Sequence, residues 1–469
     1  LYNPTSNSID LSAWDLMQLT NPSTTPSEAP FVVNGLTGTI EPNSFLVFTA
    51  SELLNNTGDW IGLYNDGGEL IDQVSFGNVT DPSYNQNTVD NPPAEESSGR
   101  IIDGGPSFQT FASPTRGLSN GTMLNTLYVD DNWTSPDNDG GHTWGFDAFS
   151  SIQDAINFAS SGSTINVEPG TYDEALVVNK SLALLGSGID GASLATINYT
   201  GCDYTVSIMA SNVTVSGFDI ANDCGETNIY IGSSLDNVNI TDNIIRDGYE
   251  GIYTNGSTNT IIQNNEIKIN IYGIYLTGNI SGSQVTDNNI HDNEEGISAN
   301  GATFSEFSIT NNQVVDNNDG YGVYFGQVQN SSSTLTIANN NISGNSNGGI
   351  YMNSVINSTL NIQDNSAISN NGQYGIYLGS AIGSTVTISG NTIQNNTSSG
   401  LYLSGTLAQV SNSTVSISGN TISSNGGDGI YADVITNSTF SILNNTQISG
   451  NGGNGVYICA DGYCADGST

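Results

Sequence analysis

The second half of the chain consists of short runs in which apolar and polar residues alternate, separated by turns rich in Asn and Gly. An alternation with period two predicts short β-strands, and no segment of this half shows the 3.6-residue apolar period of a helix. A unit of the form apolar-x-Ile-x-x-Asn-x-Ile recurs, as in "VTISGNTI" and "VSISGNTI". Between these units lies Gly-apolar-Tyr or a close variant, starting at Gly251, Gly273, Gly296, Gly322, Gly349, Gly375, Gly400, Gly429 and Gly455.

A repeat of roughly 25 residues cannot bury a core alone, whereas stacked repeats can bury one together. We therefore predict coils that stack through parallel strands about 4.8 Å apart. The pattern resembles the right-handed parallel β-helix of the pectate-lyase-like superfamily over about residues 165–458. The resemblance implies the fold. It implies no particular activity, because this fold carries many functions.

Aligning the repeats predicts two columns of identical side chains along the stack. One is an asparagine ladder in a turn, where amides can satisfy one another, at Asn243, Asn265, Asn288, Asn312, Asn340, Asn365, Asn391, Asn420 and Asn445. The other is an outward tyrosine column, interrupted by Ser298, at Tyr230, Tyr253, Tyr275, Tyr324, Tyr351, Tyr377, Tyr402, Tyr431 and Tyr457. The tyrosines could bind sugar rings or a neighbouring molecule, or they could only stabilise the sheet.

The two ends of the repeat differ. The segment "DAFSSIQDAINF" predicts a short amphipathic helix with Phe149, Ile152, Ile156 and Phe158 on its apolar side, which can cover the edge of the first coil. No comparable segment follows the last repeat. We therefore expect further protein or another molecule to cover that end.

Residues 1–120 lack the repeat and show short alternating strands such as "SFLVFTA" and "WIGLYN". The phrases "LYNPTSNSIDLSAWDL" and "NPPAEESSGRIIDG" resemble the lamin-tail domain, which implies an immunoglobulin-like sandwich with an accessory role. The predicted fold class is therefore all-β. It comprises an N-terminal immunoglobulin-like β-sandwich (1–120), a linker with a capping helix (121–165) and a right-handed parallel β-helix (166–469).

Composition limits the partners of the chain. The formal net charge of −40 comes from 45 acidic residues against only 5 Lys and Arg, so missing bases rather than abundant acids cause it. Such a chain has no electrostatic attraction for nucleic acid or for an anionic membrane. No apolar run is long enough to serve as a membrane span, either. We expect no nucleic-acid partner and no membrane insertion within this chain.

The four cysteines can form two pairs. Cys202 and Cys224 lie one coil length apart, and Cys459 and Cys464 can close a short loop. Even pairing favours disulfides and an extracellular or cell-surface location over free thiols.

Two groups of residues are candidates for chemistry. Arg246, Lys268 and His291 each follow the second Ile of three consecutive repeats, so they should stack on the outer surface. They could form an anion or uronate site, or only a surface ion-pair cluster. In "DDNWTSPDNDGGH", Asp130, Asp137 and Asp139 offer oxygen ligands for calcium, although an ordinary Asp-rich loop would look the same. Calcium is the one cofactor that the sequence suggests, and no catalytic residue is assigned.

Asn-Ser-Thr and Asn-Ser-Ser triplets recur at one turn and place the glycosylation candidates Asn330, Asn357, Asn412 and Asn437 on one side of the stack. These features favour a secreted structural cell-surface protein, such as a sheath, surface-layer or filament subunit. Its expected partners are copies of itself, associating end to end or laterally. The alternatives are a carbohydrate-active enzyme working at the cation cluster and a glycan-binding adhesin that uses the tyrosine column.

Overall fold

A computed structural model divides the chain into two compact units, residues Leu1–Leu124 with Thr143–Asp147, and residues Asn125–His142 with Ala148–Thr469. The structure describes residues 1–3, 5, 7–18, 31–33, 36–42, 44, 46, 58–77, 88–89, 97–100, 108–111, 126–133, 142, 147–188, 194–312, 314–329, 332–403, 410–460 and 463–467.

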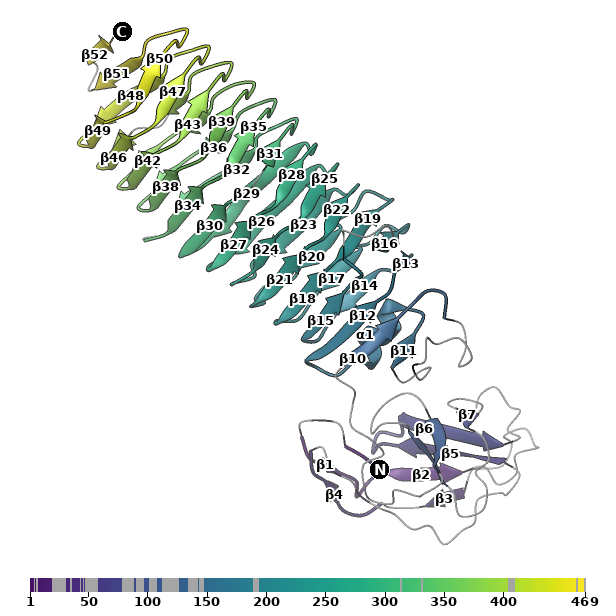
Figure 1. Ribbon diagram of the computed structural model, residues 1–469. Helices are drawn as coiled ribbons and strands as arrows, with labels where there is room; N and C mark the ends of the chain where they lie inside the picture. The colour runs from purple at the N-terminus through teal and green to yellow at the C-terminus, as the bar shows by residue number, and fades with distance from the viewer. Residues whose placement is uncertain are drawn as a thin grey trace. The chain divides into compact units, whose positions relative to one another are not determined.

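The second unit is a parallel β-solenoid in which each coil contributes strands to three sheets (Figure 1). Sheet A has 14 strands, in the order β11 (Ala148–Phe149), β10 (Thr126–Val129), β12 (Ser163–Val167), β15 (Leu182–Leu185), β18 (Val213–Ser216), β21 (Val238–Thr241), β24 (Ile261–Gln263), β27 (Ser283–Thr286), β30 (Glu306–Thr310), β34 (Thr334–Ala338), β38 (Thr359–Gln363), β42 (Thr385–Ser389), β46 (Thr414–Ser418) and β49 (Thr439–Leu443).

Sheet B has 12 strands: β13 (Gly170–Tyr172), β16 (Ala195–Tyr199), β19 (Phe218–Asn222), β22 (Ile244–Arg246), β25 (Glu266–Lys268), β28 (Asn289–His291), β31 (Val314–Asp316), β35 (Asn341–Ser343), β39 (Ala367–Ser369), β43 (Thr392–Gln394), β47 (Thr421–Ser423) and β50 (Gln447–Ser449). The chain runs from sheet A to sheet B to sheet C and back, through turns that we call the A–B, B–C and C–A turns.

Sheet C has 17 strands: β14 (Leu176–Val178), β17 (Val206–Ile208), β20 (Ile229–Ile231), β23 (Glu250–Asn255), β26 (Tyr272–Asn279), β29 (Glu295–Thr303), β32 (Val323–Phe325), β33 (Val328–Gln329), β36 (Ile350–Met352), β37 (Val355–Ile356), β40 (Ile376–Leu378), β41 (Ala381–Ile382), β44 (Leu401–Leu403), β45 (Val410–Ser411), β48 (Ile430–Thr436), β51 (Val456–Ala460) and β52 (Tyr463–Gly467).

Alternation along each strand places the apolar residues in the interior. In β42, for example, Val386 and Ile388 are fully buried, whereas Thr387 between them faces outward. Stacking aligns these inward residues from coil to coil, as Val386 pairs with Val415 and Ile388 with Ile417. The continuous core is therefore a property of the stack, as the repeat predicts.

The predicted asparagine ladder is confirmed at the A–B turn. Each amide Nδ2 donates to the Oδ1 of the next asparagine at 2.8–3.1 Å, and each backbone N–H donates to the same oxygen. The residue before each ladder asparagine has a left-handed backbone with φ of 51–68°, which explains why this column contains only Asn, Asp and Gly. Asp242 and Asp287 belong to this column and so meet a backbone requirement of the turn.

A second asparagine ladder, not predicted from the sequence, occupies the B–C turn. Its side-chain hydrogen bonds measure 2.8–3.3 Å and link Asn228, Asn270, Asn293, Asn318, Asn345, Asn371, Asn396, Asn425 and Asn451. Both ladders satisfy most of the buried backbone and side-chain groups at these turns, although the Oδ1 of Asn228, at the start of the second ladder, accepts no hydrogen bond.

The coils change length part-way along the stack. In sheet C, Ile229, Ile252, Ile274 and Ile297 pair in succession and mark three short coils. From Ile297 to Val456, the paired residues of successive coils are separated by more residues than in these short coils. Most of the longer coils add a second short strand to sheet C, at β33, β37, β41 and β45. A segment of short coils, which starts at Val206 after one long coil, is therefore followed by a segment of long coils.

The expected capping helix is α1 (Ile152–Phe158), and its buried residues are Ile152, Ala155, Ile156 and Phe158. The Glu174 carboxylate accepts hydrogen bonds from the N–H groups of Ile152 and Gln153 at the start of the helix. The described part of the chain contains no helix that could span a bilayer.

Two details at the ends of the stack extend the sequence-based picture. Strand β10 already pairs in parallel with β12, so stacking starts inside the segment predicted as linker and cap. In the last coil, Ile442 and Ile448 are partly exposed, whereas Ile417 and Ile422 of the preceding coil are fully buried. Strand β52 folds back antiparallel on β51.

The first unit is also built of β-strands. Its sheet of five strands has the order β3 (Phe31–Val33), β2 (Asp15–Gln18), β5 (Gly58–Tyr64), β6 (Leu70–Gly77) and β7 (Thr88–Val89). Two strand pairs complete the described part, β1 (Ile9–Asp10) with β4 (Thr39–Ile40), and β8 (Ser97–Arg100) with β9 (Phe108–Phe111). Leu11, Leu36 and Ile40 form a small core. These elements are consistent with an all-β domain, while the immunoglobulin-like topology and the lamin-tail assignment stay predictions.

Candidate functional site

The cation cluster lies on sheet B. Arg246 pairs with Lys268 across β22 and β25, and Lys268 pairs with His291 across β25 and β28. The three residues therefore stack on consecutive coils, at the outward positions that the repeat predicts.

Carboxylates hold each of these three side chains. The Arg246 guanidinium makes two parallel hydrogen bonds of 2.9 Å to Asp219, and a third of 2.6 Å to Asp247. These bonds, chiefly those to Asp219, outweigh the opposing effect of burial and raise the pKa of Arg246 above its usual range.

The second half of the cluster is built around Glu266. Its Oε1 accepts a 2.7 Å hydrogen bond from Lys268 Nζ and lies 3.3 Å from His291 Nε2. His291 Nδ1 lies 2.7 Å from Asp292. Burial raises the pKa of Glu266, but Lys268 and His291 outweigh it and hold that pKa below its usual value. Four carboxylates thus surround the three basic side chains, which favours an ion-pair cluster over an anion-binding site.

The tyrosine column also has the predicted register on sheet C, including its interruption at Ser298. From Tyr324 to Tyr457 the six rings are nearly parallel, with interplanar angles of 4–10° and centroids 4.5–5.6 Å apart. Each ring in the middle of this stack has both faces against its neighbours, so its edge and hydroxyl point outward. Within this run, a sugar ring could reach a tyrosine face only at the two ends.

A partial second column, missed in the sequence, lies beside the first. It alternates acidic and aromatic residues in Glu250, Tyr272, Glu295 and Tyr321. Glu295 lies on the same coil as Ser298 and accepts a 3.1 Å hydrogen bond from the Tyr321 N–H. Burial, with a smaller contribution from Glu294, raises the pKa of Glu295 to about 7.

This raised pKa predicts a specific pH dependence of stability. The ordinary pKa of Glu295 is 4.5, so between pH 4.5 and about 7 the folded state retains a proton that the unfolded state has released. Stability must then fall as the pH rises through this window. We expect Glu295→Gln to flatten that fall, as measured by the thermal unfolding midpoint at pH 4.5 and pH 8. The exposed neighbour provides the control, because Glu294 makes only the smaller contribution to the pKa of Glu295, so Glu294→Gln should keep most of the wild-type slope. Equal slopes in all three proteins would refute the assignment.

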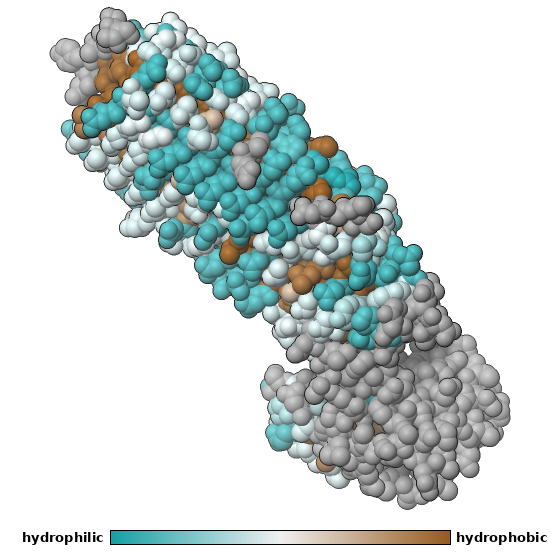
Figure 2. Space-filling view, in the orientation of Figure 1, coloured by the Kyte–Doolittle hydropathy of each residue, from teal (hydrophilic) through white to brown (hydrophobic). Residues whose placement is uncertain are grey.

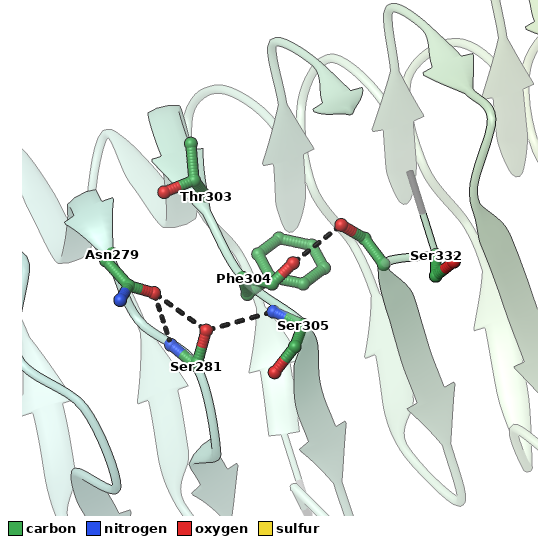
Figure 3. Close-up of a pocket in the computed structure, with 7 residues that line it drawn as sticks. Asn279, Ser281, Thr303, Phe304, Ser305 and Ser332 are labelled. Atoms are coloured by element: carbon green, nitrogen blue, oxygen red, sulfur yellow. Dashed lines mark hydrogen bonds between the residues drawn. The ribbon is translucent and has the colours of Figure 1, made fainter. Parts of the chain in front are cut away.

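A hollow of about 440 Å³ lies in the solenoid where the coils lengthen. Asn279 and Ser281 line it from one coil, Thr303 to Ser305 from the next, and Ser332 and Ser333 from the third (Figure 3). The Asn279 amide oxygen accepts a hydrogen bond from the Ser281 hydroxyl, which in turn accepts one from the Ser305 N–H. The lining is uncharged, and its polar groups largely bond to one another.

The glycosylation candidates lie at the C–A turn. Asn357, Asn412 and Asn437 are all exposed and have left-handed backbones with φ of 46–51°. Asn330 lies outside the described residues. The predicted shared turn is thus present at the three positions that can be seen.

Structural demands also explain why these triplets recur. The middle serine is the rung of a third ladder, in which Ser358, Ser384 and Ser413 each accept or donate hydrogen bonds between coils. The following residues Thr359 and Thr414 are the first outward residues of β38 and β46. Asn at a left-handed turn position, Ser in the ladder and Thr at the start of the strand are therefore each favoured by the structure.

The remaining candidates divide between described and undescribed residues. Cys202 and Cys224 form a disulfide between neighbouring coils, with Cα atoms 5.3 Å apart, as predicted. Cys459 is disulfide-bonded and lies opposite Cys464 across β51 and β52, although the Cys464 side chain is outside the described part.

Of the calcium candidates only Asp130 is described, and its carboxylate accepts hydrogen bonds from Asn132. Asp137 and Asp139 lie outside the described residues, so the calcium site stays a prediction.

Comparison with known proteins assigns the solenoid to a family. A family model described as a right-handed β-helix region matches residues 189–331 and 327–464, which is more than half of the chain. The chain belongs to this family. The chain is similar in fold to the Dettilon tailspike protein, with 18% sequence identity and a TM-score of 0.52, and the match covers 72% of this chain and 68% of the tailspike chain.

Two further proteins are similar to parts of this chain. A mannuronan C-5 epimerase A-module from Azotobacter vinelandii is 17% identical, with a TM-score of 0.45, and the match covers 66% of this chain and 93% of the module. A cell surface glycoprotein of Methanothermus fervidus is 36% identical over 104 residues, or 22% of this chain and 16% of that protein. The chain thus spans about a sixth of that relative's length.

Proposed function

We propose that this β-helix is part of a secreted, N-glycosylated cell-surface protein with a structural role, in which copies of the chain associate. The relative named cell surface glycoprotein and the disulfide between Cys202 and Cys224 support the location outside the cell. The observation that carries the glycoprotein assignment is the repeated exposure of Asn357, Asn412 and Asn437 at one turn.

A structural role fits the surface chemistry better than catalysis does. Arg246, Lys268 and His291, the only basic residues of the repeats between Gly201 and Ala460, are all engaged by carboxylates. General acid–base work needs a group that can reach the substrate and exchange a proton with it. We therefore propose no reaction at this cluster. Turnover of a polyuronate that Lys268→Ala abolishes would support the enzyme alternative instead.

The glycoprotein proposal predicts modification at specific turns. In a host that glycosylates secreted proteins, we expect Asn357, Asn412 and Asn437 to carry glycans, detected by mass spectrometry of glycopeptides. Each Asn→Gln variant should lose the glycan at its own position. The matched control is Asn353→Gln, an exposed asparagine of the same coil as Asn357 that lacks the acceptor triplet. Unmodified asparagines at all three turns in such a host would contradict the proposal.

A further inference from the structure

The outer face of sheet A is almost free of charge. From β12 to β49 its twelve strands present outward Thr, Ser, Asn, Gln and a few apolar residues, and Glu306 is the one charged residue among them. The last five strands repeat a Thr-x-(Thr/Ser/Asn) pattern, with paired columns such as Thr359, Thr385 and Thr414. Small polar side chains thus lie in straight rows along the stack.

The other two sheets are different. Sheet B carries Asp219, Arg246, Glu266, Lys268 and His291 on its outer face. Sheet C carries the tyrosine column and the carboxylates of Glu250 and Glu295. In a chain of net charge −40, sheet A is where two copies can approach with the least like-charge repulsion.

The size of this face matches a stable contact. Twelve strands about 4.8 Å apart and four to five residues wide, at about 3.3 Å per residue, give roughly 700–850 Å². A typical specific interface buries about 800 Å² on each partner. All-parallel sheets are usually covered on both faces, whereas the outer face of sheet A has no cover among the described residues.

We propose that the outer face of sheet A is the contact surface for a second copy of this chain. Rows of small hydroxyl and amide side chains on two such faces can interdigitate as in a dry sheet-to-sheet contact. The carboxylates of Asp236, Asp242, Asp287 and Asp364 lie in the turns at the edges of the face, which gives it an uncharged centre and a charged rim. Because these rims repel each other, added salt should strengthen the contact.

The turns with Asn357, Asn412 and Asn437 lie along one edge of the same face, two residues before its first row. Attached glycans would therefore border the contact along the C–A turn and leave its centre open. The A–B turn, which carries the first asparagine ladder, forms the other edge.

The test introduces charge at two paired positions. Thr387 and Ser416 are outward residues on neighbouring strands of sheet A, and Gln394 and Ser423 are their counterparts on sheet B. We expect the full-length Thr387→Asp/Ser416→Asp variant to raise the dissociation constant for self-association at least about tenfold, since like charges meet across the contact. The Gln394→Asp/Ser423→Asp control should associate like the wild type. Sedimentation velocity over a range of concentrations and salt measures association, and circular dichroism confirms that both variants fold.

Each outcome is decisive. The inference rests on the proposed self-association, so a wild-type protein that stays monomeric at every concentration and salt overturns both. A wild type that associates together with two variants that associate equally well refutes the sheet A contact but leaves self-association standing. Equal loss in both variants would show a general charge effect and would also overturn the inference.

Discussion

Replacing Asn391 with alanine is expected to lower the free energy of unfolding by about 3–5 kcal/mol. The Asn391 Oδ1 accepts hydrogen bonds from both the backbone N–H and the side-chain amide of Asn365. Its Nδ2 donates to the Ile362 carbonyl at 2.8 Å and to the Asn420 Oδ1 at 3.0 Å. The substitution removes the partner of the Asn365 backbone N–H and the amide donor to the Ile362 carbonyl, and each buried group left unpaired costs about 1–3 kcal/mol. The Asn420 Oδ1 keeps its bond from the backbone N–H of residue 391.

Denaturant unfolding measures the loss, and hydrogen exchange locates it. The exchange of the Asn365 and Asn391 amides should accelerate more than that of coils far from the substitution, because contacts in a solenoid are made between neighbours. The matched control is Asn361→Ala, since Asn361 faces outward on the adjacent strand β38 and should contribute within about 0.5 kcal/mol. An equal loss in both variants would show that the ladder has no special role.

Replacing both Cys202 and Cys224 with alanine is the second large effect, an expected loss of about 3 kcal/mol in the free energy of unfolding. The disulfide spans 22 residues, and a closed loop of that size restricts the unfolded chain by about this amount. The bond joins the B–C turns of two neighbouring coils near the start of the stack, after β16 and β19.

The loss should appear in denaturant unfolding under oxidising conditions and should disappear when wild type and variant are compared under a reductant. Hydrogen exchange should accelerate in the coils around β16 and β19 and stay unchanged around β46. A variant that is as stable as the oxidised wild type would show that the bond adds no stability.

How much the sequence predicts depends on how regular each column is. The asparagine ladder at the A–B turn was predictable because its residues keep a fixed place within a recurring unit. The second ladder follows the first after a short and nearly constant spacing, as from Asn365 to Asn371 and from Asn391 to Asn396. That spacing was a usable signal, but the many other turn asparagines obscured it.

The candidate site was only half predictable. The outward stacking of Arg246, Lys268 and His291 follows from their identical place in the repeat. Their partners do not, because Asp219 reaches Arg246 from the preceding coil, 27 residues away in sequence. Which carboxylate meets which cation depends on the register between coils and on side-chain rotamers, and neither is visible in the pattern. The exposed hydrophobic residues near the last coils were not predictable either (Figure 2). Leu443, for example, is 59% exposed, although it pairs with Ser418, a polar residue at the same outward position of the preceding coil.

The Asn-Ser-Thr turn has a consequence for how such a chain can grow. Since backbone geometry, the serine ladder and the strand each favour one residue of the triplet, duplicating a coil that contains the triplet also duplicates a potential attachment point for a glycan. The spacing of these points is then quantised by the coil rise of about 4.8 Å. Asn412 and Asn437 are one coil apart. Gly383 takes the turn position between Asn357 and Asn412, so that coil has no attachment point at this turn. The density of glycans on such a protein therefore depends on whether each coil has asparagine or glycine at this one turn position.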